Sequence, residues 1–188
     1  MNPAFGVIIL AGGNSSRMGK DKGLIEVGGI PIVQLVTNRL KEEFQHIFII
    51  SNNQAYAAFG FPTYPDLITN IGPLGGLYTG LTISPFDKNV FLSCDTPNVL
   101  NQTIHQLLAA SVVAQTTVVK SKKVHPLIGV YHQKDRKAIK EQIERKDYKL
   151  MHLLKEIDAK ELDLSAVDEK EFLNLNTQTD LENFIHNK

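Results

Sequence analysis

A short apolar stretch, residues 5–10, leads directly into a glycine pair near the start of the chain. Its continuous hydrophobicity predicts a strand buried on both faces, as in parallel sheets. Gly12 and Gly13 let the backbone turn sharply and bring its N–H groups close to an anion. Three cations follow, Arg17, Lys20 and Lys22. This order of features predicts a loop that binds a nucleoside triphosphate.

The loop differs from the two best-known phosphate-binding motifs. A P-loop requires Gly, four residues and then Gly-Lys-Ser/Thr, but five residues separate Gly13 from Gly19, and Asp21 stands where the hydroxyl is needed. A dinucleotide fingerprint requires Gly-x-Gly-x-x-Gly, which Gly12-Gly13-Asn14 does not supply. The segment instead resembles the nucleotidyltransferase signature Leu-x-Gly-Gly-x-x-x-Arg-Met-Gly-x-Asp-Lys. In this form it is similar to the molybdenum cofactor guanylyltransferases, the MobA family.

Four further segments resemble this family in the same order along the chain. They are Asp66 with residues 72–77, residues 91–97, the pair His125-Pro126, and residues 172–177. The resemblance implies an α/β fold of the nucleotide-diphospho-sugar transferase type, which is a Rossmann-like three-layer α/β/α arrangement around a mostly parallel sheet. It also implies one domain over residues 1–188, with a mainly nucleotide-binding half (1–100) and a mainly acceptor-binding half (101–188).

The hydrophobic pattern independently favours this class of fold. We predict strands at residues 5–10, 47–50, 63–64, 89–93, 116–119 and 124–131, and helices at 32–44, 54–59, 74–83, 103–114, 136–143, 148–157 and 181–185. The charged segment 155–171 is predicted to be a loop-rich surface. Alternating strands and helices predict a parallel sheet covered on both faces, and ligands of such sheets bind beyond the carboxyl ends of the strands.

The composition limits the partners and the compartment. Twenty basic and twenty acidic residues give zero net charge, so we expect no binding to nucleic acid or to an anionic membrane. One cysteine, Cys94, excludes an intramolecular disulfide and indicates a reducing, cytoplasmic location. A nucleophilic role for Cys94 is disfavoured, because a thiol within an apolar strand is usually buried. No segment is long enough to span a bilayer.

The expected reaction needs an oxyanion to attack the α-phosphorus while pyrophosphate leaves. Positioning and charge neutralisation lower most of that barrier, and an acceptor phosphate is already ionised, so no general base is required. Asp95 is the candidate Mg²⁺ ligand, with Mn²⁺ as an expected substitute; by position alone, a helix-capping role is equally open. Arg17 and Lys22 are expected to bind the triphosphate and, with Asp95, to form the catalytic set. Asp21 is a weaker candidate for orienting Lys22 or the loop.

The family resemblance also implies which residues surround the nucleotide. They are Leu10, Ala11, Gly12, Gly13, Lys22, Asn52, Asp66, Gly72, Pro73, Leu74 and Asp95. Related cytidylyl- and uridylyltransferases tend to carry alanine at the position of Gly12, and loss of that methyl makes room for a purine. Asp66 could accept hydrogen bonds from the guanine N1–H and N2 amine; contact with the ribose and an ordinary turn role are the alternatives.

The pterin acceptor is expected to contact Asn174, Asn176 and Thr177, because amide side chains offer both donors and acceptors. For Thr177, capping of the following helix is the alternative. Gln178 stands where the family usually has proline, which weakens this assignment, and Gly75 stands where alanine is more frequent. His125 is either a substrate contact or a structural residue.

The resemblance therefore implies transfer of GMP from GTP to the terminal phosphate of molybdopterin cofactor. The expected partners are these two substrates together with cofactor-delivery and molybdoenzyme-maturation proteins, and the expected state is a monomer. Three alternatives stay open: a cytidylyltransferase acting on the same pterin, a sugar-phosphate nucleotidyltransferase, and a nucleotide-binding cofactor chaperone without catalysis.

Overall fold

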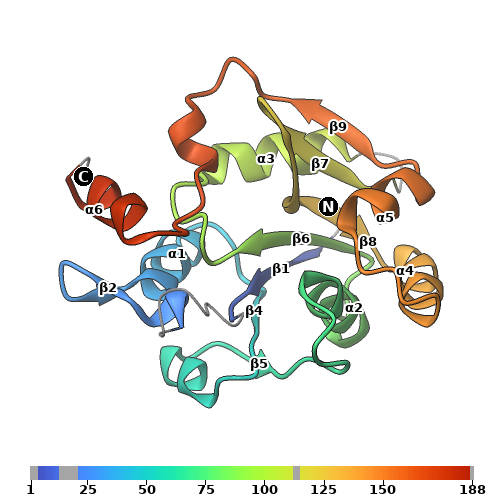
Figure 1. Cartoon of the computed structure of the whole chain (residues 1–188), viewed down its shortest axis with the longest axis horizontal. Helices are drawn as coiled ribbons and strands as arrows, with labels where there is room; N and C mark the ends of the chain where they lie inside the picture. The colour runs from blue at the N-terminus through green and yellow to red at the C-terminus, as the bar shows by residue number, and fades with distance from the viewer. Residues whose placement is uncertain (1–3, 13–20, 112–114, 187–188) are drawn as a thin grey trace.

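Seven strands form one sheet in the order β5-β4-β1-β6-β8-β7-β9 (Figure 1). The computed structural model describes residues 4–12, 21–111 and 115–186. The strands are β1 (Phe5–Leu10), β4 (Ile47–Ile50), β5 (Thr63–Tyr64), β6 (Lys88–Ser93), β7 (Thr117–Lys120), β8 (Val124–His132) and β9 (Lys160–Asp163). β8 runs antiparallel to its neighbours β6 and β7, whereas the remaining neighbouring pairs are parallel. The predicted mostly parallel sheet is confirmed.

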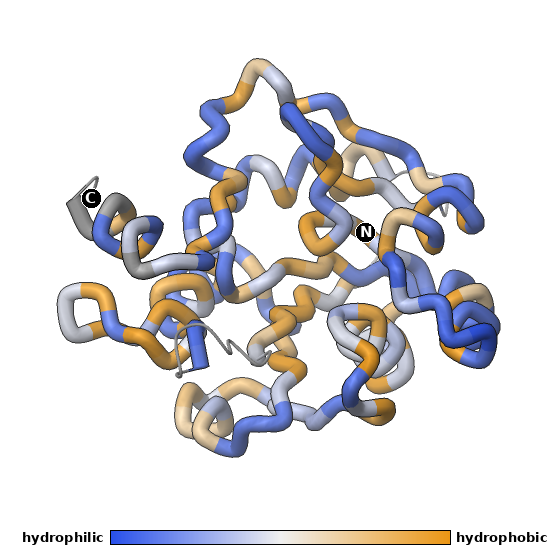
Figure 2. The backbone as a smooth tube through the Cα atoms, viewed as in Figure 1, coloured by the Kyte–Doolittle hydropathy of each residue, from blue (hydrophilic) through white to orange (hydrophobic). Residues whose placement is uncertain are grey.

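Helices cover both faces of this sheet. They are α1 (Ile32–Leu40) and α3 (Asn101–Ala110) on one face, and α2 (Pro73–Ile83), α4 (Asp135–Glu144) and α5 (Leu150–Glu156) on the other. Val7 and Ile9 of β1 pack toward the first group, and Ile8 and Leu10 toward the second. In Figure 2, β1 and β6 are mainly hydrophobic and α4 is mainly hydrophilic. Successive side chains of a strand point to opposite faces, so the predicted three-layer α/β/α arrangement is confirmed.

A small hairpin and the C-terminal helix pack together beside the sheet (Figure 1). The hairpin consists of β2 (Glu26–Val27) and β3 (Ile30–Pro31), and the helix is α6 (Gln178–His186). Leu181 and Phe184 of α6 share a buried cluster with Val27 of the hairpin and Ile32 of α1. The end of the chain is therefore joined to the segment that directly follows the nucleotide loop.

The strand β9 and the β2–β3 hairpin were not predicted. The charged segment expected to be a loop contains β9, so that prediction is wrong for residues 160–163. β9 pairs in parallel with β7, and only Leu162 among its four residues is even half-buried. Its amino-acid pattern is that of a solvated surface, and its strand conformation comes from pairing with β7. The β2–β3 hairpin also went unpredicted.

Several helix boundaries also differ from the prediction. α1 ends at Leu40 instead of residue 44, because the chain then forms a turn in which the N–H groups of Lys41 and Phe44 bond back to helix carbonyls. Phe44 remains buried, which explains why its hydrophobic spacing extended the predicted helix. α3 begins at Asn101 instead of residue 103. Its predicted last residues, 112–114, lie outside the described part of the chain.

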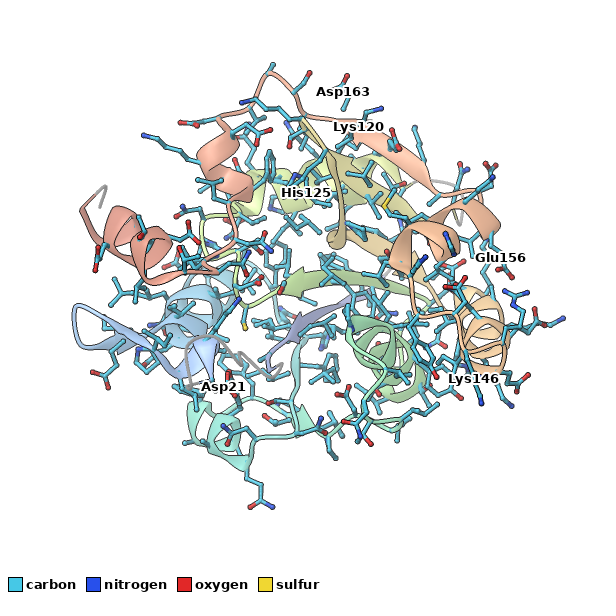
Figure 3. All side chains as sticks on the ribbon, viewed as in Figure 1. Asp21, Lys120, His125, Lys146, Glu156 and Asp163 are labelled. Carbon is cyan, nitrogen blue, oxygen red and sulfur yellow. The ribbon has the colours of Figure 1, made fainter. Side chains whose placement is uncertain are left out.

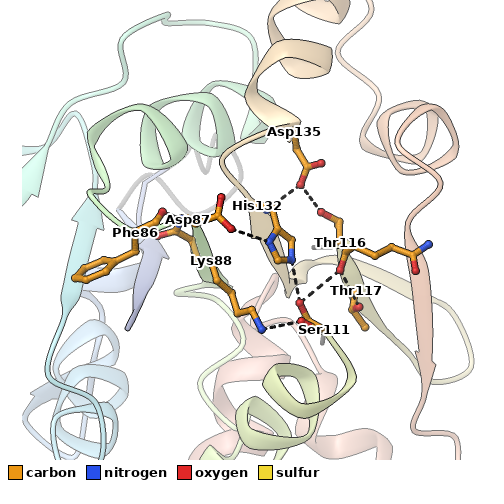
Figure 4. Close-up of polar contacts among 10 residues, drawn as sticks. Phe86, Asp87, Lys88, Ser111, Thr116, Thr117, His132 and Asp135 are labelled. Carbon is orange, nitrogen blue, oxygen red and sulfur yellow. Dashed lines mark hydrogen bonds and ion pairs between the residues drawn. The ribbon is translucent and has the colours of Figure 1, made fainter. Parts of the chain in front are cut away.

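A buried polar cluster joins the amino end of β6, the C-terminus of α3, the end of β8 and the start of α4 (Figure 4). The Lys88 ammonium donates to the carbonyl of Ser111 at 2.7 Å, and the Ser111 hydroxyl lies 3.0 Å from Nε2 of His132. The backbone N–H of His132 donates to Oδ2 of Asp135 at 2.8 Å, and the Thr116 hydroxyl donates to the same carboxylate oxygen. These contacts fix the end of the sheet opposite to the carboxyl ends of β1 and β6.

None of the described helices has the length and apolar character needed to cross a membrane.

Candidate active site

The four adjacent strands β5, β4, β1 and β6 end at the same edge of the sheet. Backbone hydrogen bonds continue past the strands there: Cys94 N–H donates to Leu10, Ala11 N–H to Ile50, and Ser51 N–H to Tyr64. The residues that follow each strand are consequently held side by side. These are Gly12, Asn52, Asp66 and Asp95, all four of which the family resemblance assigns to the nucleotide site.

Lys22, at the end of the nucleotide loop, reaches two distant parts of the chain. Its ammonium Nζ donates to Oδ1 of Asn176 at 2.5 Å and lies 3.9 Å from Oδ2 of Asp95. The Asn174 amide is 3.4 Å from the same Asp95 oxygen, and the N–H of Leu175 donates to the Asp95 carbonyl at 2.8 Å. The structure thus brings the predicted triphosphate, metal and acceptor residues together.

Asp95 does not cap a helix. α3 begins six residues later, with Leu100 at its N-cap, so the capping alternative for Asp95 is excluded. Its Oδ1 atom is buried without a hydrogen-bond partner among the described residues. A buried carboxylate oxygen left open at a strand end, with a cation nearby, fits a hard divalent cation such as Mg²⁺, which prefers oxygen ligands.

Asn52 and Asp66 form a reciprocal pair. The Asn52 amide donates to Oδ2 of Asp66 at 2.9 Å, and the backbone N–H of Asp66 donates to the Asn52 amide oxygen at 2.9 Å. The other carboxylate oxygen, Oδ1, is buried and has no partner among the described residues. Burial raises the pKa of Asp66, while the bond from Asn52 opposes that shift. The carboxylate is therefore oriented with one unused acceptor.

The first turn of α2 packs against the end of β1. A Cβ added at Gly76 would lie 2.9 Å from a methyl carbon of Leu10, so glycine allows this close approach. Gly72, at φ +64°, is the N-cap of α2, and Pro73 occupies the first turn. Leu74 is fully buried, so only its backbone N–H, at the positive end of the helix dipole, is available to a phosphate. Gly75 packs against the segment that precedes α2, since a Cβ there would lie 2.7 Å from the carbonyl oxygen of Ile68.

Gly12 has a backbone reason to be glycine. Its φ is +114°, and an added Cβ would lie 3.3 Å from the Ser51 hydroxyl. A positive φ is costly for residues with a Cβ. The sequence-based expectation explained Gly12 by space for a purine. The backbone conformation is a second reason for glycine at this position, and it does not depend on which base is bound.

Thr177 caps α6. Its hydroxyl accepts from the N–H of Asp180 at 3.1 Å, and the Asp180 carboxylate accepts from the N–H groups of Thr177 and Asn176 at 2.8 and 3.0 Å. This reciprocal arrangement resembles a capping box. The capping alternative for Thr177 is confirmed, and a contact between Thr177 and the acceptor stays a prediction.

Cys94 and His125 have structural surroundings. Burial raises the pKa of the Cys94 thiol to about 12, so the thiol is protonated at neutral pH and unsuited to nucleophilic attack. His125 is buried, with Nε2 at 2.8 Å from the Ser121 hydroxyl and its ring 5.3 Å from that of Phe172. Figure 3 shows His125 in a different part of the molecule from Asp21. These contacts agree with a structural role for His125.

Three of the expected site residues cannot be placed, and two residues near the site were not expected. Gly13, Arg17 and Lys20 lie outside the described residues. Asn53 and Tyr56 both donate hydrogen bonds to Asp21 and were not predicted from the sequence. Tyr56 lies 35 positions along the chain from Asp21, and no sequence pattern indicated the contact.

Known proteins that are similar to this chain identify its family and share its fold. A family model described as MobA-like NTP transferase domain matches residues 7–162. The molybdenum cofactor guanylyltransferase of Yersinia pseudotuberculosis is 35% identical over 185 residues, covering 96% of this chain and 94% of that protein.

Two crystal structures share the fold. Molybdopterin-guanine dinucleotide biosynthesis protein A from Archaeoglobus fulgidus matches with a TM-score of 0.84 and 18% identity, covering 96% of each chain. An Aquifex aeolicus protein matches with a TM-score of 0.81 and 29% identity, covering 93% of this chain and 95% of that one. The resemblance seen in the sequence is confirmed, and this chain belongs to the MobA-like NTP transferase family.

Proposed function

We propose that this protein transfers GMP from GTP to the terminal phosphate of molybdopterin cofactor, forming molybdopterin guanine dinucleotide. The observation that carries the proposal is the meeting of Lys22 and Asp95 with Asn174 and Asn176. A cation and a carboxylate suited to a triphosphate thereby lie next to amide groups suited to a polar heterocycle. The name of the Yersinia pseudotuberculosis relative, molybdenum cofactor guanylyltransferase, supports the same reaction.

The proposed reaction is a displacement at the α-phosphorus of GTP. An oxygen of the acceptor phosphate attacks, a new P–O bond forms, and the bond from the α-phosphorus to the bridging oxygen breaks. Pyrophosphate leaves with that electron pair. The acceptor oxygen is already ionised at neutral pH, so the protein has to hold the two phosphates in line and offset their charge. Lys22 would provide part of that charge, and Arg17 is proposed to assist it.

Asp95 would hold the proposed Mg²⁺ ion, or Mn²⁺ in its place, through the carboxylate oxygen to which no described residue donates a hydrogen bond. When bound, such an ion neutralises charge on phosphate oxygens. Lys22, 3.9 Å from the other oxygen, would help to orient that carboxylate toward the phosphates.

Guanine selection is proposed to depend on Asp66. Its Oδ1, which has no hydrogen-bond partner in the described part of the chain, and the fixed orientation given by Asn52 suit the adjacent N1–H and N2–H donors of guanine. The backbone at Leu10, Ala11 and Gly12 would lie along the same base. Cytosine and uracil do not present this donor pair, so GTP would be preferred.

The remaining expectations complete the proposal. A cytoplasmic monomer would receive molybdopterin cofactor from a delivery protein and pass the product to molybdoenzyme-maturation proteins.

A nucleotide panel tests the proposed function. The purified chain is incubated with molybdopterin, Mg²⁺ and GTP, ATP, CTP or UTP, and kcat/KM and product mass are measured for each. We expect GTP to be favoured on the order of 100-fold or more. Faster use of CTP or UTP would overturn the guanine assignment, and nucleotide binding without turnover would favour the chaperone alternative.

A further inference from the structure

The Asp21 carboxylate accepts three hydrogen bonds from residues that the structure describes. The Tyr56 hydroxyl donates to Oδ1 at 2.5 Å, the Asn53 amide to Oδ2 at 3.2 Å, and the Gly23 N–H to Oδ1 at 3.3 Å. Asn53 and Tyr56 belong to the segment around the short helix η2 (Gln54–Phe59), which lies beside Asp21 in Figure 3. Both carboxylate oxygens are therefore engaged by one neighbouring segment and by the next turn of the chain.

The donors themselves are held in place. Tyr56 is fully buried, and a Cβ added at Gly23 would lie only 2.3 Å from its hydroxyl oxygen. The phenol thus packs directly against the turn that follows Asp21. The Asn53 side chain also accepts from the N–H of Ala55 at 3.0 Å, so its amide orientation is determined by the start of η2. Tyr56 and Asn53 form a preorganised support for the carboxylate.

This support acts on the residue next in sequence. Asp21 is the N-cap of the short helix η1 (Lys22–Leu24), and Lys22 is the first residue of that turn. The Lys22 ammonium in turn reaches Asn176 and Asp95. A displacement of Asp21 would therefore displace the start of the Lys22 side chain.

The charge of Asp21 also requires an explanation, because a carboxylate near a triphosphate would repel it. The hydrogen bonds from Tyr56, Asn53 and Gly23 occupy both oxygens of the carboxylate and orient it toward η2. The loop can then carry an acidic residue beside Lys22 without presenting its oxygens to the nucleotide.

We propose that Asp21, held by Tyr56 and Asn53, is a positioning residue that sets the placement of Lys22 on the transferred phosphates. The inference rests on the proposed function, since it assigns Lys22 to the triphosphate. In this proposal Asp21 acts through Lys22 and not by contact with the substrate.

Two buried tyrosines offer a matched test. Tyr56→Phe removes the hydroxyl that bonds to Asp21. Tyr131→Phe removes an equally buried hydroxyl that donates to the Pro126 carbonyl at 2.7 Å, away from the nucleotide loop. Both variants are assayed for Tm, nucleotide KM and kcat. We expect similar losses of Tm, but a fall in kcat on the order of 10- to 100-fold for Tyr56→Phe only, because a small misplacement of a phosphate-binding group slows transfer strongly.

A double-variant comparison sharpens the result. Asp21→Asn keeps an oxygen acceptor for Tyr56 but loses the charge. The double variant, Asp21→Asn with Tyr56→Phe, should be no slower than the slower of the two single variants, because both substitutions act on one network. Asp21→Asn alone carries the test if Tyr56→Phe does not fold. Equal kcat for Tyr56→Phe and Tyr131→Phe, or multiplied losses in the double variant, would overturn the proposal.

The kinetic assays use whichever nucleotide the wild type turns over fastest. If that nucleotide is CTP, the proposed guanine specificity fails, yet the effect of Tyr56→Phe on kcat still tests the positioning role. If GTP is used and Tyr56→Phe behaves like Tyr131→Phe, the positioning role fails and the proposed function stands.

Discussion

The Lys22 ammonium donates a hydrogen bond to Oδ1 of Asn176 at 2.5 Å, although 154 positions separate the two residues in the chain. The contact joins the end of the nucleotide loop to the segment preceding α6. A triphosphate that draws Lys22 toward itself has to compete with Asn176 for the same ammonium. The proposed binding of the nucleotide and the placement of the proposed acceptor segment would therefore be linked at one side chain.

Replacing Asn176 should affect the acceptor more than the nucleotide. Asn176→Ala removes an amide proposed to bind the pterin, so we expect the KM for molybdopterin to rise on the order of tenfold, as for one lost hydrogen bond. The affinity for GTP should stay unchanged or increase, because Lys22 loses a competing partner. Steady-state kinetics with each substrate varied in turn measures both effects.

Asn98→Ala is the control for that variant, since Asn98 also bonds to the C-terminal segment, at the Lys170 carbonyl, but not to Lys22. It should leave both KM values close to those of the wild type. A larger loss of GTP affinity than of acceptor affinity in Asn176→Ala would contradict the acceptor assignment.

Removing the charge of Asp95 should separate binding from transfer. Asp95→Asn keeps the shape of the side chain but weakens its hold on a divalent cation, so we expect transfer to fall on the order of 100- to 1,000-fold. GTP binding measured by titration calorimetry should persist. Chelation by EDTA should stop the wild-type reaction, and Mg²⁺ or Mn²⁺ should restore it.

The matched control is Asp87→Asn, which changes a largely exposed carboxylate (76% exposed) next to the opposite end of β6. Its transfer rate should equal that of the wild type. Unchanged turnover in Asp95→Asn would remove Asp95 from the metal role.

The role of Asp66 can be tested with a base that lacks one donor. Inosine triphosphate has the N1–H of guanine but no N2 amine. If Asp66 accepts from both groups, the wild type should bind GTP roughly 10-fold or more tightly than ITP, because a hydrogen bond to a charged group contributes about 1.5–3 kcal/mol. In Asp66→Asn the two affinities should become nearly equal. An unchanged GTP/ITP ratio in the variant would place Asp66 on the ribose or in a purely structural role.

The buried His132 should make stability depend on pH. Burial lowers the pKa of His132 below its usual 6.5, against opposing effects of Asp135 and Asp87 (Figure 4). The unfolded chain therefore takes up a proton near pH 6.5 before the folded chain does, and the free energy of unfolding falls as the pH drops below that value. The slope for one proton is at most about 1.4 kcal/mol per pH unit.

Urea unfolding of the wild type and His132→Gln at pH 7.5, 6.0 and 5.0 measures this contribution. We expect the stability advantage of the wild type to shrink as the pH falls. His46→Gln, at an exposed histidine, is measured alongside as the substitution control. A wild-type advantage that grows on acidification would contradict the direction of the shift.

The sequence predicted the elements whose hydrophobic pattern is strong. β1 and β4 are nearly continuous apolar runs, β6 carries the apolar residues Val90, Phe91 and Leu92 in succession, and their common edge followed from the rule for parallel sheets. β9 could not be found in this way, because Lys160, Glu161 and Asp163 are charged and the strand is set by pairing with Thr117–Lys120. The β2–β3 hairpin did leave a readable signal, since Gly28 and Gly29 both have positive φ and such glycine pairs favour tight hairpin turns.

In the candidate site, too, local motifs were predictable from the sequence and contacts between distant residues were not. Lys22, Asp66 and Asp95 were found from motifs that stand next to strands. The contacts of Lys22 with Asn176 and of Asp21 with Tyr56 join residues far apart in the chain. Which side chains meet across such distances depends on packing of complete elements, such as α6 against the β2–β3 hairpin, and not on local spacing.

The most direct test of the proposed activity follows the phosphates of GTP. Molybdopterin, Mg²⁺ and the wild-type chain are incubated with GTP labelled at the α- or the γ-phosphate, and the label in the pterin product and in pyrophosphate is measured. Guanylyl transfer places the α-label in the pterin product and the γ-label in pyrophosphate, in equal amounts. Label from the γ-phosphate in the pterin, or release of free phosphate without a labelled pterin, would contradict the proposed reaction.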